Sequence, residues 1–430
     1  MPALVELAAR EILDSRGVPT IEVDIRLDSG ARGRAAAPSG GSKGKREATE
    51  LRDNDRNRYS GAGVRRAVTI VREVIAPALI GTDFETTAAL DRRLLELDGA
   101  PQRSQLGANA ILAISMAVTR ALAGEGSLHE HLAPAEKWRL PVPMFNVLNG
   151  GAHANNNVDF QEFMVAPIGA PNFAEALRMG VETYWALRAV LKHRGKATSV
   201  GDEGGFAPDL DRHSEPFDLL MLAIEQAGLK PAKDIVIAVD AAAGELSDGD
   251  TYVFRKSMRR RRTTERMIEF YANCLRQFPI WSIEDGLAET DIEGWRALTT
   301  ALGTRVQLVG DDLFVTNASL LRDGIMDGIA NAVLIKPNQI GTVSETLETI
   351  SEATQGGYGV IISHRAGETT DDFIADLAVA SGAGQIKAGA PVRGERVAKY
   401  NQLLRLEETL GAKAVYAGRQ FRERGGFLCS

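Results

Sequence analysis

The strongest constraint on the fold is a series of short apolar runs between residues 234 and 389, each followed at once by a charged residue. Continuous apolar runs of this length are typical of strands that are buried on both faces, as in a parallel sheet. The segments between the runs, such as 264–278 and 343–354, have helical spacing. Strand and helix in alternation predict an α/β fold built as a closed (β/α) barrel. The charged residues at the ends of the runs are Asp240, Glu284, Asp311, Lys336, the pair His364 and Arg365, and Lys387.

In such a barrel the carboxyl ends of the parallel strands meet at one mouth, so these side chains are predicted to share a single site. One acid at a strand end is more often a helix cap or a solvated turn residue than a functional group. Capping does not explain the whole series, because a cap has no need of a lysine, and both Lys336 and Lys387 follow apolar runs.

Composition places the chain among ordinary globular proteins. It has 430 residues, 44% hydrophobic and 25% charged, with a net charge of −7, which gives no general signal for nucleic-acid binding. Cys274 and Cys429 are the only cysteines, which is too few for a disulfide framework. The N-terminus lacks a secretory signal pattern, and no apolar run is long enough to span a bilayer. We therefore expect a cytoplasmic protein without a membrane or nucleic-acid partner.

Two domains are predicted. Residues 1–132 combine strand alternation on both sides of the turn 14–17 with helical periodicity over 63–80 and 109–122, which indicates an α+β domain. The segment 133–143 holds three prolines and is typical of a domain junction. Residues 133–430 then form the barrel domain.

Other segments offer further candidates. The small-residue loop 38–45 is either a linker or a lid, and its place inside a domain favours a lid. Gln161 and Glu162 form a polar pair inside a predicted strand, where burial is costly without partners. Glu203 lies between glycines, and taken alone it is better explained by a surface turn. The basic run 255–262 is better explained by a solvated surface insertion than by phosphate or RNA contact.

Long, ordered motifs along nearly the whole chain resemble the enolase family. The motifs are Arg10-Glu-Ile-Leu-Asp-Ser-Arg-Gly17, Leu106-Gly-Ala-Asn-Ala-Ile111, Gly201-Asp-Glu-Gly-Gly205, Ser282-Ile-Glu-Asp285, Lys336-Pro-Asn-Gln-Ile-Gly341, Ser363-His-Arg365 and Asn401-Gln-Leu-Leu-Arg405. The resemblance implies an N-terminal α+β domain on an atypical (β/α)8 barrel with one antiparallel strand. It also implies two Mg²⁺ ions, a phosphorylated three-carbon acid as substrate, and a homodimer or a ring of dimers.

The family reaction is the dehydration of 2-phosphoglycerate to phosphoenolpyruvate, and hard divalent cations suit the charge that builds on the substrate carboxylate. Enolase-superfamily sites use a lysine or histidine base together with Mg²⁺. By resemblance, Asp240, Glu284 and Asp311 bind the first Mg²⁺ and Ser42 the second. The resemblance also assigns the base to Lys336, with a pKa lowered by burial and Mg²⁺, and the acid to Glu203 supported by Glu162. Residues implied to contact the substrate are His153, Gln161, His364, Arg365 and Lys387.

The chain departs from the family pattern near the predicted phosphate site. Ala366 stands where the family has serine after the Ser-His-Arg motif, and Gly41 and Lys43 replace alanine and threonine in the lid. The loss of a hydroxyl at Ala366 and the added charge of Lys43 predict altered recognition of the phosphoryl group. His129 and His131 replace two tyrosines and, outside any site motif, are predicted to lie on the surface.

Three interpretations follow from these residues. The first is a working enolase with tolerated drift. The second is a paralogue for a related phosphonyl substrate, similar to carboxyphosphonoenolpyruvate synthase of phosphonate antibiotic pathways, which uses a phosphonoformyl unit carried as a cytidylate ester. The third is a non-catalytic enolase fold used for structure or adhesion, against which the complete catalytic set argues.

Overall fold

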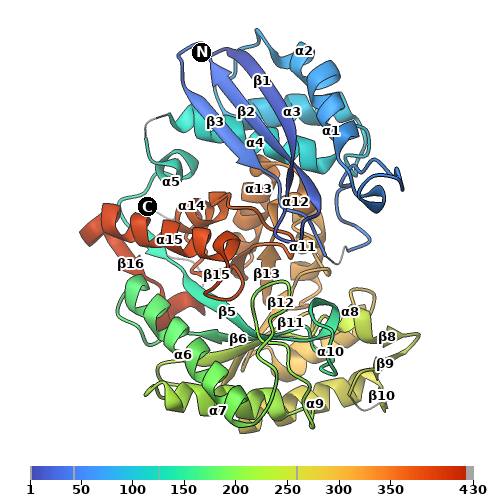
Figure 1. Ribbon diagram of the computed structural model, residues 1–430, viewed down its shortest axis with the longest axis vertical. Coiled ribbons are helices and arrows are strands. Elements are labelled where there is room, and N and C mark those ends of the chain that lie inside the picture. The colour runs from blue at the N-terminus through green and yellow to red at the C-terminus, as the bar shows by residue number, and fades with distance from the viewer. Residues whose placement is uncertain (1, 42–43, 125, 258–259, 423–430) are drawn as a thin grey trace.

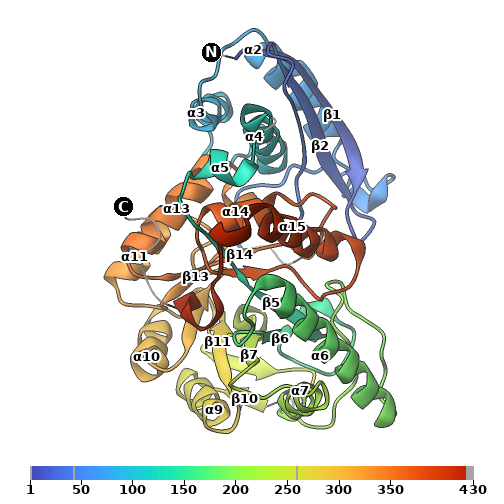
Figure 2. The same cartoon turned by 90° about the vertical axis from the view of Figure 1, so that its left-hand side faces the viewer.

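A computed structural model describes residues 2–41, 44–124, 126–257 and 260–422 (Figure 1). An N-terminal domain lies at one end of the molecule and a closed barrel at the other (Figures 1 and 2). None of the helices in these described ranges combines the length and apolar character needed to cross a membrane.

The N-terminal domain begins with an antiparallel sheet of three strands, joined by short turns. Its first two strands meet at the predicted turn after Leu13, where the Asp14 carboxylate accepts the backbone N–H groups of Arg16 and Val18. The strands are β1 (Leu4–Leu13), β2 (Pro19–Leu27) and β3 (Arg32–Ala36), and the helices are α1 (Arg65–Ile70), a π-helical turn (Val71–Ile75), α2 (Ala76–Leu79), α3 (Thr87–Asp98), α4 (Ala108–Ala123) and α5 (Leu128–Leu132).

Helix α4 joins the two parts of the molecule. It is apolar nearly all round, because it packs on β2 and β3 on one side and on barrel helices on the other. In Figure 2 it lies between the sheet and the barrel. In the short helix α5, which follows, the structure corrects the prediction for one histidine. His129 is buried rather than on the surface, because its ring packs edge-on against Trp138 at 5.3 Å between centroids, whereas His131 is exposed as predicted.

Eight strands close the barrel and confirm the predicted fold class. All neighbouring strands are parallel except around β6, which runs antiparallel to both β5 and β7. This is the single reversed strand that the family resemblance implied, and it brings the start of β6 to the mouth. In order around the barrel, the strands are β5 (Val142–Asn149), β6 (Glu162–Ala166), β7 (Val236–Asp240), β11 (Ile280–Glu284), β12 (Gln307–Gly310), β13 (Ala332–Ile335), β14 (Gly359–Ser363) and β15 (Gln385–Lys387).

Helices cover the outside of the barrel, and threonine side chains cap several of them. Thr263 and Thr342 each accept a backbone N–H from the first turn of the helix that follows. The helices are α6 (Phe173–His193), α7 (Glu215–Gln226), α8 (Ala243–Leu246), α9 (Thr264–Gln277), α10 (Ile292–Leu302), α11 (Ala318–Met326), α12 (Pro337–Ile340), α13 (Val343–Gln355), α14 (Phe373–Ala380) and α15 (Gly394–Leu410). Smaller strands are β4 (Trp138–Leu140), β8 (Ser247–Asp248), β9 (Thr251–Phe254), β10 (Arg260–Arg262) and β16 (Ala414–Tyr416).

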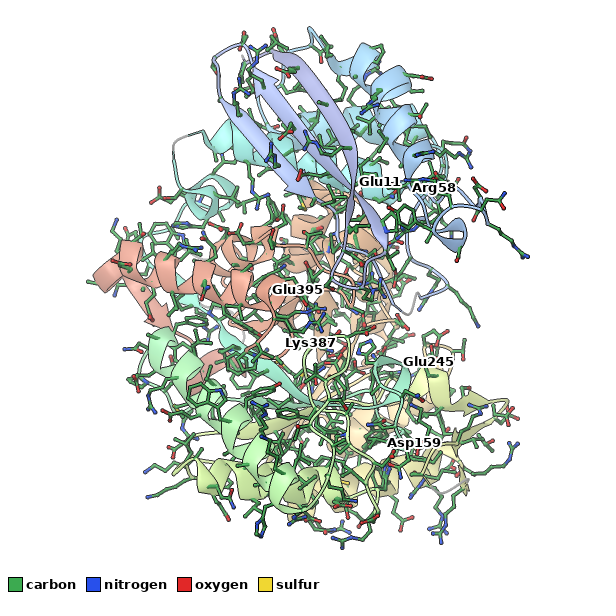
Figure 3. All side chains as sticks on the ribbon, in the orientation of Figure 1. Glu11, Arg58, Asp159, Glu245, Lys387 and Glu395 are labelled. Carbon is green, nitrogen blue, oxygen red and sulfur yellow. The ribbon has the colours of Figure 1, made fainter. Side chains whose placement is uncertain are left out.

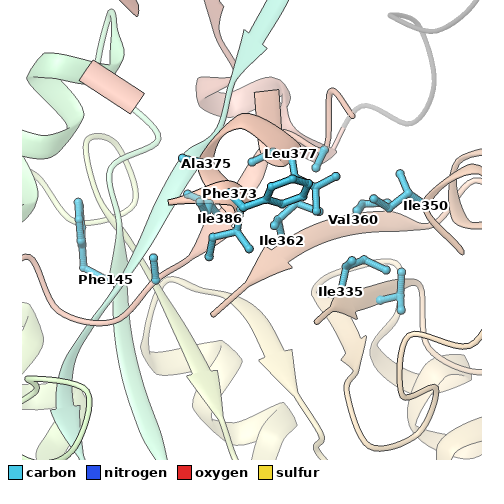
Figure 4. Close-up of a cluster of buried hydrophobic side chains, with 14 of the residues drawn as sticks. Phe145, Ile335, Ile350, Val360, Ile362, Phe373, Ala375, Leu377 and Ile386 are labelled. Atoms are coloured by element: carbon cyan, nitrogen blue, oxygen red, sulfur yellow. The ribbon is translucent and has the colours of Figure 1, made fainter. Parts of the chain in front are cut away.

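The apolar runs are continuous because each strand contributes to two cores. On β13, Ala332 and Leu334 belong to the cluster inside the barrel, while Val333 and Ile335 pack outward in the cluster shared with the helices. Figure 4 shows Ile335 of β13 with residues of β14 and α14 in this outer layer. Alternate side chains of one strand therefore face opposite sides, and both sides exclude water.

Acid stability is expected to depend on His213. Its ring lies 5.0, 4.6 and 5.1 Å from the rings of Phe160, Phe254 and Phe270, and burial lowers its pKa to about 4. An unfolded chain takes up the proton near the ordinary pKa of about 6.5, so the unfolded state binds more protons between these values and stability falls as the pH falls. We expect His213 to cost roughly 2 kcal/mol of unfolding free energy between about pH 7 and about pH 5.

The measurement is urea unfolding of the native protein and of His213→Gln at both pH values. The difference in unfolding free energy between the two proteins should move by roughly 2 kcal/mol in favour of the variant at the lower pH. If the difference between the two proteins is the same at both pH values, His213 takes up its proton at an ordinary pKa in the folded protein.

Candidate active site

The mouth of the barrel gathers the charged residues at the strand ends, as the sequence predicts. Asp240 and Glu284 lie side by side at the ends of β7 and β11, and Asp311 follows β12, the next strand. The reversed strand β6 places Glu162 opposite Asp240. Lys336 is the residue after β13, and Lys387 ends β15. In Figure 3, Lys387 lies at the centre of the molecule, between the N-terminal domain and the lower part of the barrel.

Lys387 is enclosed by carboxylates. Its Nζ lies 2.8 Å from Glu284 Oε1 and 3.1 Å from both Asp240 Oδ2 and Glu162 Oε2, and the residue is 2% exposed. Burial lowers the pKa of an ammonium group, but the three acids outweigh that effect and raise the pKa of Lys387 well above its ordinary value. Lys387 is therefore a fixed positive charge in the floor of the site.

Lys336 pairs with Asp311, whose other oxygen accepts a hydrogen bond from Gln339 at 2.9 Å. The residues of the chain shift the Lys336 pKa upward, opposite to the lowering that burial and Mg²⁺ were predicted to give. Burial acts in the lowering direction, but the Asp311 carboxylate outweighs it and raises the pKa above 10.5. The prediction relied on burial and Mg²⁺, and no pattern in the sequence placed the Asp311 carboxylate on the ammonium group.

Two glutamates and two histidines form the other side of the site. His153 Nδ1 lies 3.5 Å from Glu162 and 3.6 Å from Glu203, and His364 Nε2 lies 3.3 Å from Glu203. Burial and the Glu203 carboxylate raise the pKa of Glu162 well above its ordinary value. Burial acts in the same direction at Glu203, but His364, His153 and Arg396 outweigh it and lower that pKa. The two glutamates therefore differ in their affinity for a proton, which Glu162 binds more tightly than Glu203.

Burial disfavours the charged form of both histidines. It lowers the pKa of His153, and it lowers that of His364 to about 3 although Glu203 opposes the shift. Arg396 contributes to this, because its guanidinium lies 2.6 Å from His364 Nδ1. With that guanidinium as the donor, His364 Nδ1 is the acceptor and Nε2 carries the hydrogen toward Glu203.

Arg365 is held by the N-terminal domain. It makes two hydrogen bonds to the Glu47 carboxylate, at 3.0 and 3.2 Å, and one to Asn338 at 3.0 Å. Glu47 lies just beyond the predicted lid, which is anchored where Ser39 pairs with Gly367. Ser42 and Lys43, a predicted metal ligand and a predicted substrate contact, lie outside the described residues.

Two cavities open at this mouth. One is lined by His153, Glu203, Lys336, His364, Arg365, Ala366 and Lys387, together with Gly41, Gln161, Glu162, Asp240 and Ser363. A neighbouring cavity of about 220 Å³ is mainly acidic, with Asp285, Asp312 and Glu289 in its wall. The two share Gln161 and Asp240. All the predicted site residues that the structure describes lie at this mouth.

The donors at the mouth fit a hard divalent cation. Glu284 Oε2 and Gln161 Oε1 are buried oxygens without a hydrogen-bond partner among the described residues, and oxygen is the donor that Mg²⁺ prefers. In the described part of the chain, acids close enough to share one ion form the group Asp285, Asp311 and Asp312 and a group of His153 with the two glutamates. The predicted trio is not among these groups, and its carboxylates pair with lysines instead, Asp240 and Glu284 with Lys387 and Asp311 with Lys336.

Several contributors escaped the sequence analysis. Asn146 donates to Glu203 at 2.9 Å from inside the apolar strand β5, where a lone buried amide was a usable signal. Arg396, fully buried on α15, and Glu47 carried no local signal, because each looks like a residue on the solvated face of a helix or loop. Their roles depend on contacts with distant segments.

The fold and the site define a barrel enzyme in which buried lysines lie against buried carboxylates. The profile of the family described as "Enolase, N-terminal domain" matches residues 4–131, and "Enolase, C-terminal TIM barrel domain" matches residues 137–424. A protein named Enolase from Acidothermus cellulolyticus is 56% identical over 420 residues, which cover 97% of each chain. The chain therefore belongs to the enolase family.

Proposed function

We propose that the protein removes water from 2-phosphoglycerate to give phosphoenolpyruvate. The observation that carries the proposal is the pair of buried lysines among acids at one mouth, in a chain that matches an enolase along nearly its full length. Asp240, Glu284 and Asp311, with Ser42 for a second ion, are the residues that would hold Mg²⁺. When bound, the cation supplies positive charge for the substrate carboxylate.

The proton transfers and the binding of the phosphate are assigned to residues of the chain itself. In its neutral amine form, Lys336 accepts the proton from the carbon next to the carboxylate, and Lys387 places its fixed charge beside that carboxylate. The electron pair of the broken C–H bond first passes onto the substrate carboxylate, and in a second step it forms the double bond as the C–O bond to the hydroxyl breaks. The proton held by Glu162 and Glu203 goes to the departing hydroxyl and completes water. Arg365 binds the phosphate, and its Glu47 contact marks where an anion fits.

The test is the formation of phosphoenolpyruvate, followed by its ultraviolet absorbance, from 2-phosphoglycerate and Mg²⁺. Absence of product with the folded protein would overturn the proposal. The phosphonate alternative rested on Lys43 and Ala366, and the match to an enolase over 97% of both chains favours the ordinary reaction instead. A non-catalytic fold would not require two buried lysines, whose desolvation is costly. A homodimer or a ring of dimers remains our expectation for the assembly.

Ala366→Ser is expected to strengthen substrate binding. Ala366 lines the cavity beside Arg365 and is 6% exposed, so a hydroxyl there faces the proposed phosphate. A hydrogen bond to a charged group is worth roughly 1.5–3 kcal/mol, and allowing for imperfect geometry we expect KM to fall roughly three- to tenfold with kcat little changed. Steady-state kinetics with 2-phosphoglycerate make the measurement.

Gly41→Ala is the matched control. Its added methyl group would lie 3.0 Å from Ala366 Cβ and 3.1 Å from Arg16 Nη1, so it fills the same space without adding a donor. We expect KM to stay level or rise in this variant. A fall in KM of the same size in both variants would mean that packing, not a hydrogen bond, changes affinity.

A further inference from the structure

Lys256 and Ser257, two residues of the basic run, hold the loop that carries His153 through a set of hydrogen bonds, called the clasp below. Asp159, 3% exposed, accepts the backbone N–H groups of Lys256 and Ser257 at 2.8 and 2.9 Å, and also the Ser257 hydroxyl. These bonds join the end of strand β9 to the start of β6. Figure 3 shows Asp159 at this edge of the barrel, on the side of the β8–β9–β10 sheet.

The Lys256 side chain makes the remaining hydrogen bonds of the clasp. Its Nζ donates to the carbonyl of Gly151 at 2.5 Å and to the carbonyl of Ala154 at 2.8 Å. These two carbonyls bracket His153 in the chain. Hydrogen bonds from a charged donor are stronger than those between neutral groups. One side chain therefore ties both ends of the turn that presents His153 to the site.

The far side of the same loop is held differently. Asn156 donates to the carbonyls of Asn149 and Pro208 at 2.9 and 3.1 Å, and Asn157 donates to Leu210 at 2.8 Å. Backbone bonds also hold the turn, since the Gly151 N–H donates to the Val158 carbonyl at 2.9 Å and the Asp202 N–H donates to the His153 carbonyl at 3.4 Å. Within the described residues, Lys256 is the side chain that donates to the carbonyls of that turn.

The other described arginines of the run have separate contacts. Arg255 donates to the carbonyl of Glu245, Arg261 pairs with Asp248, and Arg262 stacks on Phe254 and Phe270 at 5.0 and 4.8 Å. Arg260 is exposed and has no partner among the described residues. The described part of the run is thus partly structural, and Arg260 offers a charge-matched control on the same sheet.

We propose that Lys256 is a positioning residue, which holds the Gly151–Ala154 turn so that His153 stays against Glu162 and Glu203. The proposal rests on the proposed function, because it assigns His153 to the side of the site that protonates the departing hydroxyl. It predicts a selective defect. Removing the clasp slows loss of the hydroxyl but leaves removal of the α-proton by Lys336, on the opposite side of the site, unchanged.

The test compares Lys256→Met with Lys256→Arg and Arg260→Met. We expect kcat for phosphoenolpyruvate formation to fall roughly five- to thirtyfold in Lys256→Met, with KM within about twofold of native. Exchange of the substrate α-proton with deuterated water should continue at the native rate. Amide hydrogen exchange over 151–154 should be faster in Lys256→Met, near native in Lys256→Arg and native in Arg260→Met.

Each other outcome decides against the proposal in a distinct way. Native kcat and native amide exchange in Lys256→Met would overturn the clasp itself. Equal slowing of α-proton exchange and product formation would overturn the selective role of the turn and indicate a general loosening of the site. If the native protein forms no product, the proposed function fails, whereas amide exchange over 151–154 still tests the clasp.

Discussion

Lys336→Ala is expected to stop the exchange of the substrate α-proton with deuterated water and to lower kcat by about 10²–10⁴-fold. The side chain is buried at the mouth and paired with Asp311, and alanine leaves no group there that can accept a proton. The loss of an ammonium group also leaves Asp311 without its ion-pair partner, which adds to the effect. Proton NMR of 2-phosphoglycerate in deuterated buffer measures the exchange directly.

Glu203→Gln tests whether the residue that donates a proton to the hydroxyl differs from the residue that removes the α-proton. It removes an ionisable group from the opposite side of the site, where Glu203 contacts His153 and His364. We expect this variant to form little product while α-proton exchange continues. If exchange persists in Lys336→Ala and stops in Glu203→Gln, the roles of the two residues are the reverse of those proposed.

Removal of divalent cations is expected to abolish activity, and Asp311→Asn is expected to weaken Mg²⁺ binding by roughly 10–100-fold. The carboxylate is buried, and the variant keeps its shape but loses its charge. Calorimetric titration of metal-free protein with Mg²⁺ measures the affinity without relying on turnover. Full activity after exhaustive chelation would show that the acids at the mouth serve only as partners of the lysines.

Two further variants decide which acids hold the ion. Glu284→Gln alters the predicted trio, and Asp312→Asn alters the separate group in which Asp285, Asp311 and Asp312 lie close together. We expect Glu284→Gln to weaken Mg²⁺ binding strongly and Asp312→Asn to weaken it little. The opposite order would place the ion in the Asp285 group, in the wall of the acidic cavity.

Much of the site was predictable because its signals are local. An apolar run indicates a strand that is buried on both faces, and the charged residue that follows it indicates the mouth of the barrel. The motifs around Lys336 and Ser363 made the resemblance to a family visible. Asn146, Glu47 and Arg396 were missed because the contacts that give them a role lie in segments far away along the chain.

The sequence by itself determined the barrel, the family and the strand ends that carry charge, since each depends on short-range pattern. Only the tertiary structure decided how those charges pair. Reversal of β6 put Glu162 opposite Asp240, and docking of the N-terminal domain brought Glu47 onto Arg365, a residue 318 positions away in the chain. The direction of the Lys336 pKa shift followed from such pairing, because burial and a neighbouring carboxylate act in opposite directions and only the geometry shows which prevails.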